Sequence, residues 1–144
     1  MTFDRQRFVD DLTRLALMDI PWLHQGDDPM VGCDCVGIIK HAAELQIVLP
    51  EELAEAFTAY HRPPNGRRMM ATMRRFLTEI EPETRKPGDL IVFYIRKNPC
   101  HLAVEMHNGQ IAEALEAPGV SRFMIRPIPS DRPIAACFRV PDAI

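Results

Sequence analysis

The spacing of apolar residues changes along the chain, and this change constrains the fold most. Up to about residue 80 apolar side chains recur every three or four residues, as in "DRQRFVDDLTRLALM" and "GRRMMATMRRFLTEI", which predicts helices with one buried face. After residue 87 the pattern becomes short apolar runs between turn residues: "DLIVFYIR", "CHLAVEMH", "QIAEALE", "RFMIRPI" and "IAACFRV". Such runs are typical of strands. The order predicts an α+β fold, with N-terminal helices packed on a C-terminal antiparallel β-sheet.

The chain has 144 residues, enough for one domain with its own core and too few for two. We therefore expect a single domain over residues 1–144.

The last predicted helix carries Met69, Met73, Phe76 and Ile80 on one face. The helical pattern predicts helices over residues 4–18, 34–49, 51–61 and 66–80.

Charge and composition argue against several classes of protein. The formal net charge of −3 gives no reason to expect nucleic-acid binding. No stretch approaches the apolar length of a membrane span. The N-terminal "MTFDRQRFVDDLTRLALMDI" has acids and arginines scattered through it, whereas a secretory signal needs a basic start and an uninterrupted apolar run. We expect synthesis in the cytoplasm without a signal peptide, followed by retention there or release by another route.

Two of the four cysteines stand one residue apart in "GCDCVG", residues 32–37. A disulfide between Cys33 and Cys35 would be strained at this separation and does not suit the cytoplasm. Zinc sites usually pair cysteines two to four residues apart. Cys100 and His101 are adjacent and would point to opposite faces of a strand. We therefore expect no metal and no cofactor.

Cys35 has two interpretations that the residues alone leave open. It follows Asp34, a candidate N-cap, at the start of a predicted helix. A helix N-terminus places partial positive charge beside a thiol and lowers its pKa, which would make Cys35 a nucleophile. The alternative is a small buried hydrophobic residue. Cys33 lies in the preceding loop, where it could line the same cleft, and has no assigned role.

A nucleophilic thiol needs a base, and His101 is the best placed histidine. It lies on a predicted central strand, "HLAVEM", after a proline-containing loop. The order of a cysteine on a helix followed by a histidine on a strand is that of papain-like enzymes. His24, in the loop before the cysteines, is a candidate for lining the site.

A third group should orient the imidazole, and the turn at Asn108-Gly109 decides which glutamate can do so. A two-residue turn would pair His101 with Glu116 and place Glu113 on the opposite face. A three-residue turn with a glycine bulge would bring Glu113 onto the face of His101, within diagonal reach. The residues leave both glutamates open.

The chain resembles the NlpC-type cell-wall peptidases, which are papain-like cysteine enzymes, and within them the phage-tail and gene-transfer-agent branch. The matching stretches run in family order and cover nearly the whole chain from about residue 15. They are "PWLHQG", "GCDCVGIIK", "KPGDLIVF", "HLAVEMHNGQIAEA" and "RPIAACFRVP". The resemblance implies the papain-like fold and a peptidase activity.

The resemblance also implies roles for individual residues. Cys35 matches the nucleophile and His101 the base, and the third polar residue, commonly histidine in an "HA" ending, falls on Glu113. Trp22 stands where many members carry a tyrosine whose hydroxyl reaches the site. Asp34 matches a position associated with binding the free amine of the substrate. Together with His24, Trp22 and Asp34 are therefore the expected substrate-binding residues.

The implied reaction is hydrolysis of an amide in the stem peptide of peptidoglycan, typically between D-glutamate and the diamino acid. The expected partners are this stem peptide and other tail or tail-tip proteins, in a virion or phage-like particle that opens the wall for DNA delivery. Two alternatives stay open. One is a structural tail-tip component that keeps the fold without cleaving, and the other is an intracellular thiol amidase or acyltransferase on the same fold.

Overall fold

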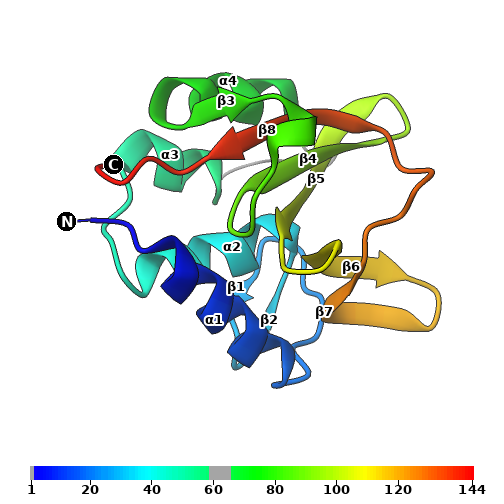
Figure 1. Cartoon of the computed structure of the whole chain (residues 1–144). Coiled ribbons are helices and arrows are strands. Elements are labelled where there is room, and N and C mark those ends of the chain that lie inside the picture. The colour runs from blue at the N-terminus through cyan, green and yellow to red at the C-terminus, as the bar shows by residue number, and fades with distance from the viewer. Residues whose placement is uncertain (1, 59–65) are drawn as a thin grey trace.

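The computed structural model describes residues 2–58 and 66–144 (Figure 1). Within these residues the helices are α1 (Arg5–Ala16), α2 (Cys35–Glu44), α3 (Glu51–Ala56) and α4 (Gly66–Phe76), with a short 3-10 turn at Pro82–Thr84. The strands are β1 (Asp27–Asp28), β2 (Gly32–Cys33), β3 (Thr78–Ile80), β4 (Leu90–Ile95), β5 (Asn98–Glu105), β6 (Gln110–Ala117), β7 (Val120–Pro127) and β8 (Ile134–Arg139). The longest described helix, α1, has 12 residues, which is too few to cross a bilayer.

Six strands form one antiparallel sheet in the order β3-β8-β4-β5-β6-β7, and β1 and β2 form a separate small hairpin. Strand β8 returns from the end of a long connection to lie between β3 and β4 (Figure 1). The helices come first in the chain and the large sheet follows, so the predicted α+β architecture is confirmed.

The sheet has a buried core on each face. The larger core joins the helices to one face, which carries Val92, Leu102 and Val104. The smaller core lies on the other face and contains Ile91, Phe93, Ala103, Ile111 and Cys137. Because side chains alternate along a strand, neighbouring residues of β5 belong to different cores. His101 is paired with Phe93 across the strands and so faces the smaller core.

In the described part of the chain all four helices end earlier than the apolar pattern predicts, and α1 ends at Ala16, two residues before its predicted end. The last one ends at Phe76, and Ile80 lies instead in β3, where it pairs with Cys137 of β8. The spacing fits a helix, but pairing with a distant strand overrides it. The helix from residue 34 ends at Glu44, and the chain to Pro50 has no regular structure. The helix predicted over residues 51–61 ends at Ala56 and is followed by a turn at residues 57–58, while residues 59–61 lie outside the described residues.

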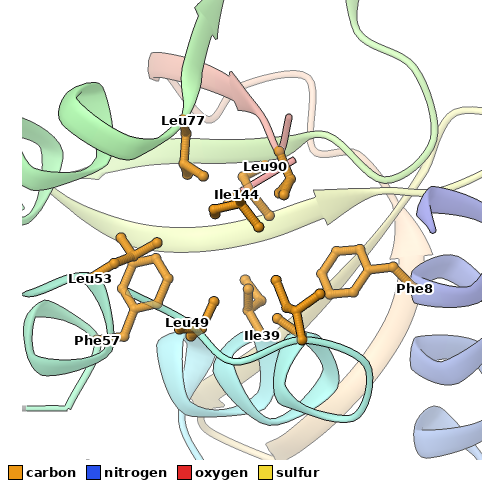
Figure 2. A pocket seen from close by; sticks show the side chains of 11 residues that line it. Phe8, Ile39, Leu49, Leu53, Phe57, Leu77, Leu90 and Ile144 are labelled. Carbon is orange, nitrogen blue, oxygen red and sulfur yellow. The ribbon is translucent and has the colours of Figure 1, made fainter. Parts of the chain in front are cut away.

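The larger core contains a cavity with an empty volume of about 310 Å³ that includes space open to solvent. Figure 2 shows apolar side chains around it, drawn from the helices, from the sheet and from the C-terminal residues. Ligand pockets need some polar groups to orient what they bind. Since all of the lining residues are apolar, we attribute this cavity to incomplete packing of the core. They are Phe8, Ile39, Ala43, Ile47, Leu49, Leu53, Phe57, Leu77, Leu90, Val140 and Ile144.

Candidate active site

Asp34 caps the helix that begins at Cys35. One carboxylate oxygen accepts a hydrogen bond from the backbone N–H of Gly37 at 2.7 Å, and the other accepts from the N–H of Gln25 at 2.8 Å. The predicted N-cap is therefore present. Burial raises the pKa of Asp34, against the lowering effect of these backbone bonds. Both oxygens already have backbone partners, so the structure gives Asp34 a local role, and its binding of a substrate amine stays a prediction.

The loop before the helix brings two further candidate residues to the same end of α2. The indole of Trp22 and the imidazole of His24 stack with ring centroids 6.3 Å apart. Trp22 forms a backbone bridge to Cys33, and the positive charge of His24 lowers the pKa of Asp34. The three predicted substrate-binding residues therefore lie near one another, although nothing in their geometry assigns them a ligand.

The sulfur of Cys35 lies against strand β5. It is 3.9 Å from the carbonyl oxygen of Cys100, and the backbone of Leu102 also acts on the thiol. These two residues flank His101 in the strand. The sulfur can approach the backbone here because β5 pairs with β6 only at Val104 and Glu105. Nearer its start, β5 has no β6 partner on that edge.

The thiol of Cys35 does not have the lowered pKa that its place at a helix start predicts. Burial raises the pKa of Cys35 to about 12, and the charge of Asp34 adds to the rise. Hydrogen bonding from the backbone of Leu102 and of Cys35 itself opposes it but is weaker. The expected effect of the helix terminus is thus outweighed by desolvation and a neighbouring carboxylate. Cys35 is a neutral thiol in the unliganded chain at neutral pH.

Glu113 contacts His101, with Oε1 of Glu113 2.6 Å from Nε2 of His101. The strand register explains the contact. Val104 pairs with Ala112, and the N–H of Met106 donates to the carbonyl of Gln110, so three residues form the turn. Asn108 and Gly109 both have positive φ, at 60° and 71°, a left-handed conformation that glycine and asparagine adopt more readily than other residues.

The alternative glutamate lies elsewhere. Glu116 pairs with Ser121 of β7, in the part of β6 that has no β5 partner. It lies three positions after Glu113 along β6, an odd offset, so its side chain points to the other face of the sheet. Of the two glutamates that the sequence leaves open, Glu113 is the one against His101.

Two arginines that no sequence pattern indicates also lie at Glu113. Nη1 of Arg132 donates to Oε1 at 2.5 Å, and Nε of Arg126 lies 3.7 Å from Oε2. Burial would raise the pKa of Glu113, but hydrogen bonds from His101 and Arg132 outweigh it and lower the pKa. In the sequence, the one indication that cations lie here is Glu113 itself, because a carboxylate on an apolar face needs a positive partner.

The ionised state of Glu113 fixes the proton on the histidine ring. A carboxylate can only accept hydrogen bonds, so Nε2 of His101 must donate to it. In the neutral imidazole the other nitrogen, Nδ1, then carries the lone pair. His101 can therefore act as a base through Nδ1 while Glu113 holds the opposite edge of its ring.

The other cysteines do not form a metal site among the described residues. In residues 2–58 and 66–144 no group of three or more His, Cys, Asp or Glu side chains could hold a metal ion. Cys33 was expected in a loop, with a place in the cleft, but it lies in β2 and is fully buried in the larger core. Burial raises its pKa to about 12. Its pairing with β1 and with Trp22 accounts for the difference, since both hold its backbone in extended form.

No family sequence model matches the chain, and no curated protein matches its sequence. Solved structures do match its fold. The NlpC/P60 domain of the peptidoglycan hydrolase SagA has a TM-score of 0.62 at 18% identity, over 96% of this chain and 100% of that one. The peptidoglycan hydrolase RipB from Mycobacterium tuberculosis has a TM-score of 0.61 at 20% identity, over 95% of this chain and 66% of that one.

A protein of the NLP/P60 family, similar to a lipoprotein, from Staphylococcus aureus subsp. aureus Mu50 gives a TM-score of 0.62 at 20% identity. The match covers 97% of this chain but 43% of that protein. The chain thus corresponds to the whole of the SagA domain and to less than half of the staphylococcal protein. It has the papain-like fold of the NlpC/P60 domains.

Proposed function

We propose that the chain is a cysteine peptidase or amidase that hydrolyses an amide bond in peptidoglycan stem peptides, between D-glutamate and the diamino acid. One arrangement carries the proposal: the thiol of Cys35, at the start of a helix, lies against the backbone that flanks His101, whose ring is held by the buried Glu113. The similarity in fold to SagA and RipB, which are peptidoglycan hydrolases, supports the choice of substrate.

In the proposed reaction the sulfur of Cys35 attacks the amide carbon while Nδ1 of His101 takes the thiol proton. Because the raised pKa keeps the thiol neutral beforehand, proton transfer accompanies the attack. Backbone N–H groups at the start of α2 stabilise the oxyanion. The imidazolium then protonates the leaving amine, and the C–N bond breaks to give a thioester. Water, deprotonated by His101, hydrolyses the thioester and regenerates the thiol.

We assign substrate contacts to the loop before α2. The stacked rings of Trp22 and His24 offer an apolar surface with polar edges for the stem peptide. Trp22 stands in place of a tyrosine, and an indole can donate but cannot accept a hydrogen bond. Asp34 is assigned the free amine of the substrate by the sequence resemblance.

We also propose that the activity serves the tail of a phage or phage-like particle, where it opens the wall locally for DNA delivery. The support is the resemblance of five sequence stretches to the phage-tail and gene-transfer-agent branch. Assembly with other tail proteins would carry the chain to peptidoglycan. Mass spectrometry of purified particles tests this role, since a chain found only in the soluble cell extract would contradict it.

The activity is tested by digestion of purified peptidoglycan with the wild type, Cys35→Ser and Cys33→Ala. The last variant removes the other thiol of the pair, which is buried away from the proposed chemistry, and circular dichroism checks that all three proteins are folded. We expect the wild type and Cys33→Ala to release soluble fragments that mass spectrometry identifies as cut after D-glutamate. Cys35→Ser should release none.

Equal inactivity of wild type and Cys35→Ser would contradict the hydrolase and favour the structural tail-tip component. Cleavage of small amide or thioester substrates with no release from peptidoglycan would favour the intracellular thiol amidase or acyltransferase.

A further inference from the structure

The Glu113 carboxylate is shared between a histidine and two arginines. Oε1 contacts Nε2 of His101 at 2.6 Å and Nη1 of Arg132 at 2.5 Å. Oε2 has no hydrogen-bond partner among the described residues, and Nε of Arg126 lies 3.7 Å from it. The Glu113 side chain is fully buried, whereas that of Arg126 is 38% exposed. Arg132 is therefore the closest permanent positive charge to a carboxylate that water does not reach.

This arrangement separates two tasks at Glu113. A buried carboxylate must be neutralised by an opposite charge if it is to stay ionised. A neutral imidazole can donate one hydrogen bond but supplies no charge, whereas a guanidinium is charged at every working pH. While His101 is neutral and able to act as a base, Arg132 must supply the charge that keeps Glu113 ionised.

Arg132 is itself held in place. It lies in the connection between β7 and β8, and its guanidinium stands over the ring of Phe93 at 4.9 Å from the centroid. The same ring lies 6.1 Å from that of His101. Such cation–π contacts favour a guanidinium over a flexible ammonium. Phe93 thus fixes both the arginine and the imidazole that share Glu113.

We propose that Arg132 is a positioning residue, which keeps Glu113 ionised and thereby fixes the His101 tautomer whose Nδ1 can accept the thiol proton. The inference rests on the proposed function. Among the described residues, four groups face the His101–Glu113 pair. They are Arg132 from the β7–β8 connection, Arg126 from β7, the ring of Phe93 from β4, and the Cys35 thiol, which lies at the carbonyl oxygen of Cys100 beside His101.

The test is an NMR titration that needs no substrate. The Glu113 carboxyl carbon and the His101 ring nitrogens are followed against pH in the wild type, Arg132→Gln and Arg132→Lys. We expect the midpoint of Glu113 protonation to rise by about one pH unit or more in Arg132→Gln, because the charge is lost while the burial remains. Arg132→Lys should keep a midpoint near that of the wild type. Arg122→Gln, on β7 and paired with the exposed Asp19, should not change it.

A matching effect is expected in turnover. In Arg132→Gln kcat/KM should fall about tenfold at neutral pH and its acid limb should move to higher pH, since the His101–Glu113 pair then binds its proton more tightly. A purely structural role for Arg132 would leave the acid limb where it is in the wild type.

An unchanged Glu113 midpoint in Arg132→Gln overturns the inference, as does a shift in Arg132→Lys as large as that in the glutamine variant. If Arg132→Gln does not fold, the wild type alone decides. A carboxyl that protonates below the ordinary glutamic acid value of about 4.3 supports the inference, and one that protonates above it overturns it. The titration can also be made on Cys35→Ser. Its result therefore does not depend on whether the chain hydrolyses peptidoglycan.

Discussion

The α-carbon of Gly37 lies directly against the carbonyl oxygen of Gly26. A Cβ atom built on Gly37 would be 1.8 Å from that oxygen, well inside any tolerated contact. The N–H of Asp34 also donates to the same oxygen at 3.2 Å. The loop that carries His24 is therefore pressed against the first turn of α2, and only glycine allows it to come so close.

Replacement of Gly37 by alanine should lower the free energy of unfolding by about 3 kcal/mol, because the loop backbone must move away. Urea denaturation measures the loss. Gly109→Ala is the matched control. Its Cβ would meet nothing within 4 Å, and only the positive φ of 71° opposes the substitution, so the expected loss is about 1 kcal/mol. Equal losses in the two variants would mean that the contact with Gly26 is not tight.

Loss of the Asp89 carboxylate should destabilise the fold far more than loss of a surface acid. Asp89 is fully buried and binds Nε and Nη2 of Arg139 at 2.9 and 2.6 Å, with Arg5 at 3.2 Å. Asp89→Ala should lower the free energy of unfolding by about 3 kcal/mol, since two cations lose their partner. Glu52→Ala breaks the exposed pair with Arg75 and should cost less than about 1 kcal/mol. Thermal or urea unfolding measures the free energy lost in each variant. A larger loss in Glu52→Ala than in Asp89→Ala would contradict the prediction.

Glu113 should make stability depend on pH in acid. Its pKa is lowered in the folded chain because the hydrogen bonds from His101 and Arg132 outweigh the effect of burial. A carboxylate whose pKa is lower in the folded chain than in the unfolded chain stabilises the fold. The stabilisation is complete at pH values above the unfolded pKa of about 4.3, and it is lost as the pH falls through the pKa of the folded chain. Glu113→Gln lacks this contribution.

The difference in unfolding free energy between wild type and Glu113→Gln should therefore be largest near neutral pH and shrink below about pH 4. Urea denaturation at a series of pH values measures it. A difference that grows towards acid pH would show that the pKa of Glu113 is raised rather than lowered in the folded chain.

Alkylation of Cys35 should be slow at neutral pH and still rise with pH in the alkaline range. The reason is the pKa of about 12, which burial and the charge of Asp34 produce, because the thiolate is the reactive form. In Asp34→Asn the rate should increase, since the charge is gone while an amide oxygen can still cap α2. Peptide mass spectrometry after treatment with iodoacetamide resolves Cys35 from the other thiols.

Glu44→Gln removes a charge from the far end of the same helix, where Glu44 pairs with Lys40, and should leave the Cys35 rate unchanged. A rate that reaches its plateau below pH 8 in the wild type would show that the thiolate forms easily and would contradict the prediction.

Local signals made part of this site readable from the sequence. The cap at Asp34, the helix start at Cys35 and the strand around His101 depend on neighbours within a few residues. The choice between Glu113 and Glu116 depends on one residue of turn length at Asn108-Gly109, and either turn suits these residues. Residue types alone could not select it.

Contacts between distant parts of the chain could not be predicted from the sequence. Arg132 stands in an irregular connection without any period, so no pattern indicates that it reaches Glu113. Ile80 continues the helical spacing of α4 and yet pairs with Cys137, which only the position of β8 decides. The raised pKa of Cys35 likewise comes from burial, which the helix start alone does not report.

The division of the sheet into two cores has a consequence for how this chain can evolve. Cys35 packs on the larger core, whereas His101, through Phe93, belongs to the smaller one. Substitutions in the smaller core can move His101, the proposed base, while the helix that begins at Cys35, the proposed nucleophile, keeps its contacts with the larger core. Such substitutions would lower the proposed activity and leave the folded scaffold stable, so that loss of activity and loss of folding are separate events for this architecture.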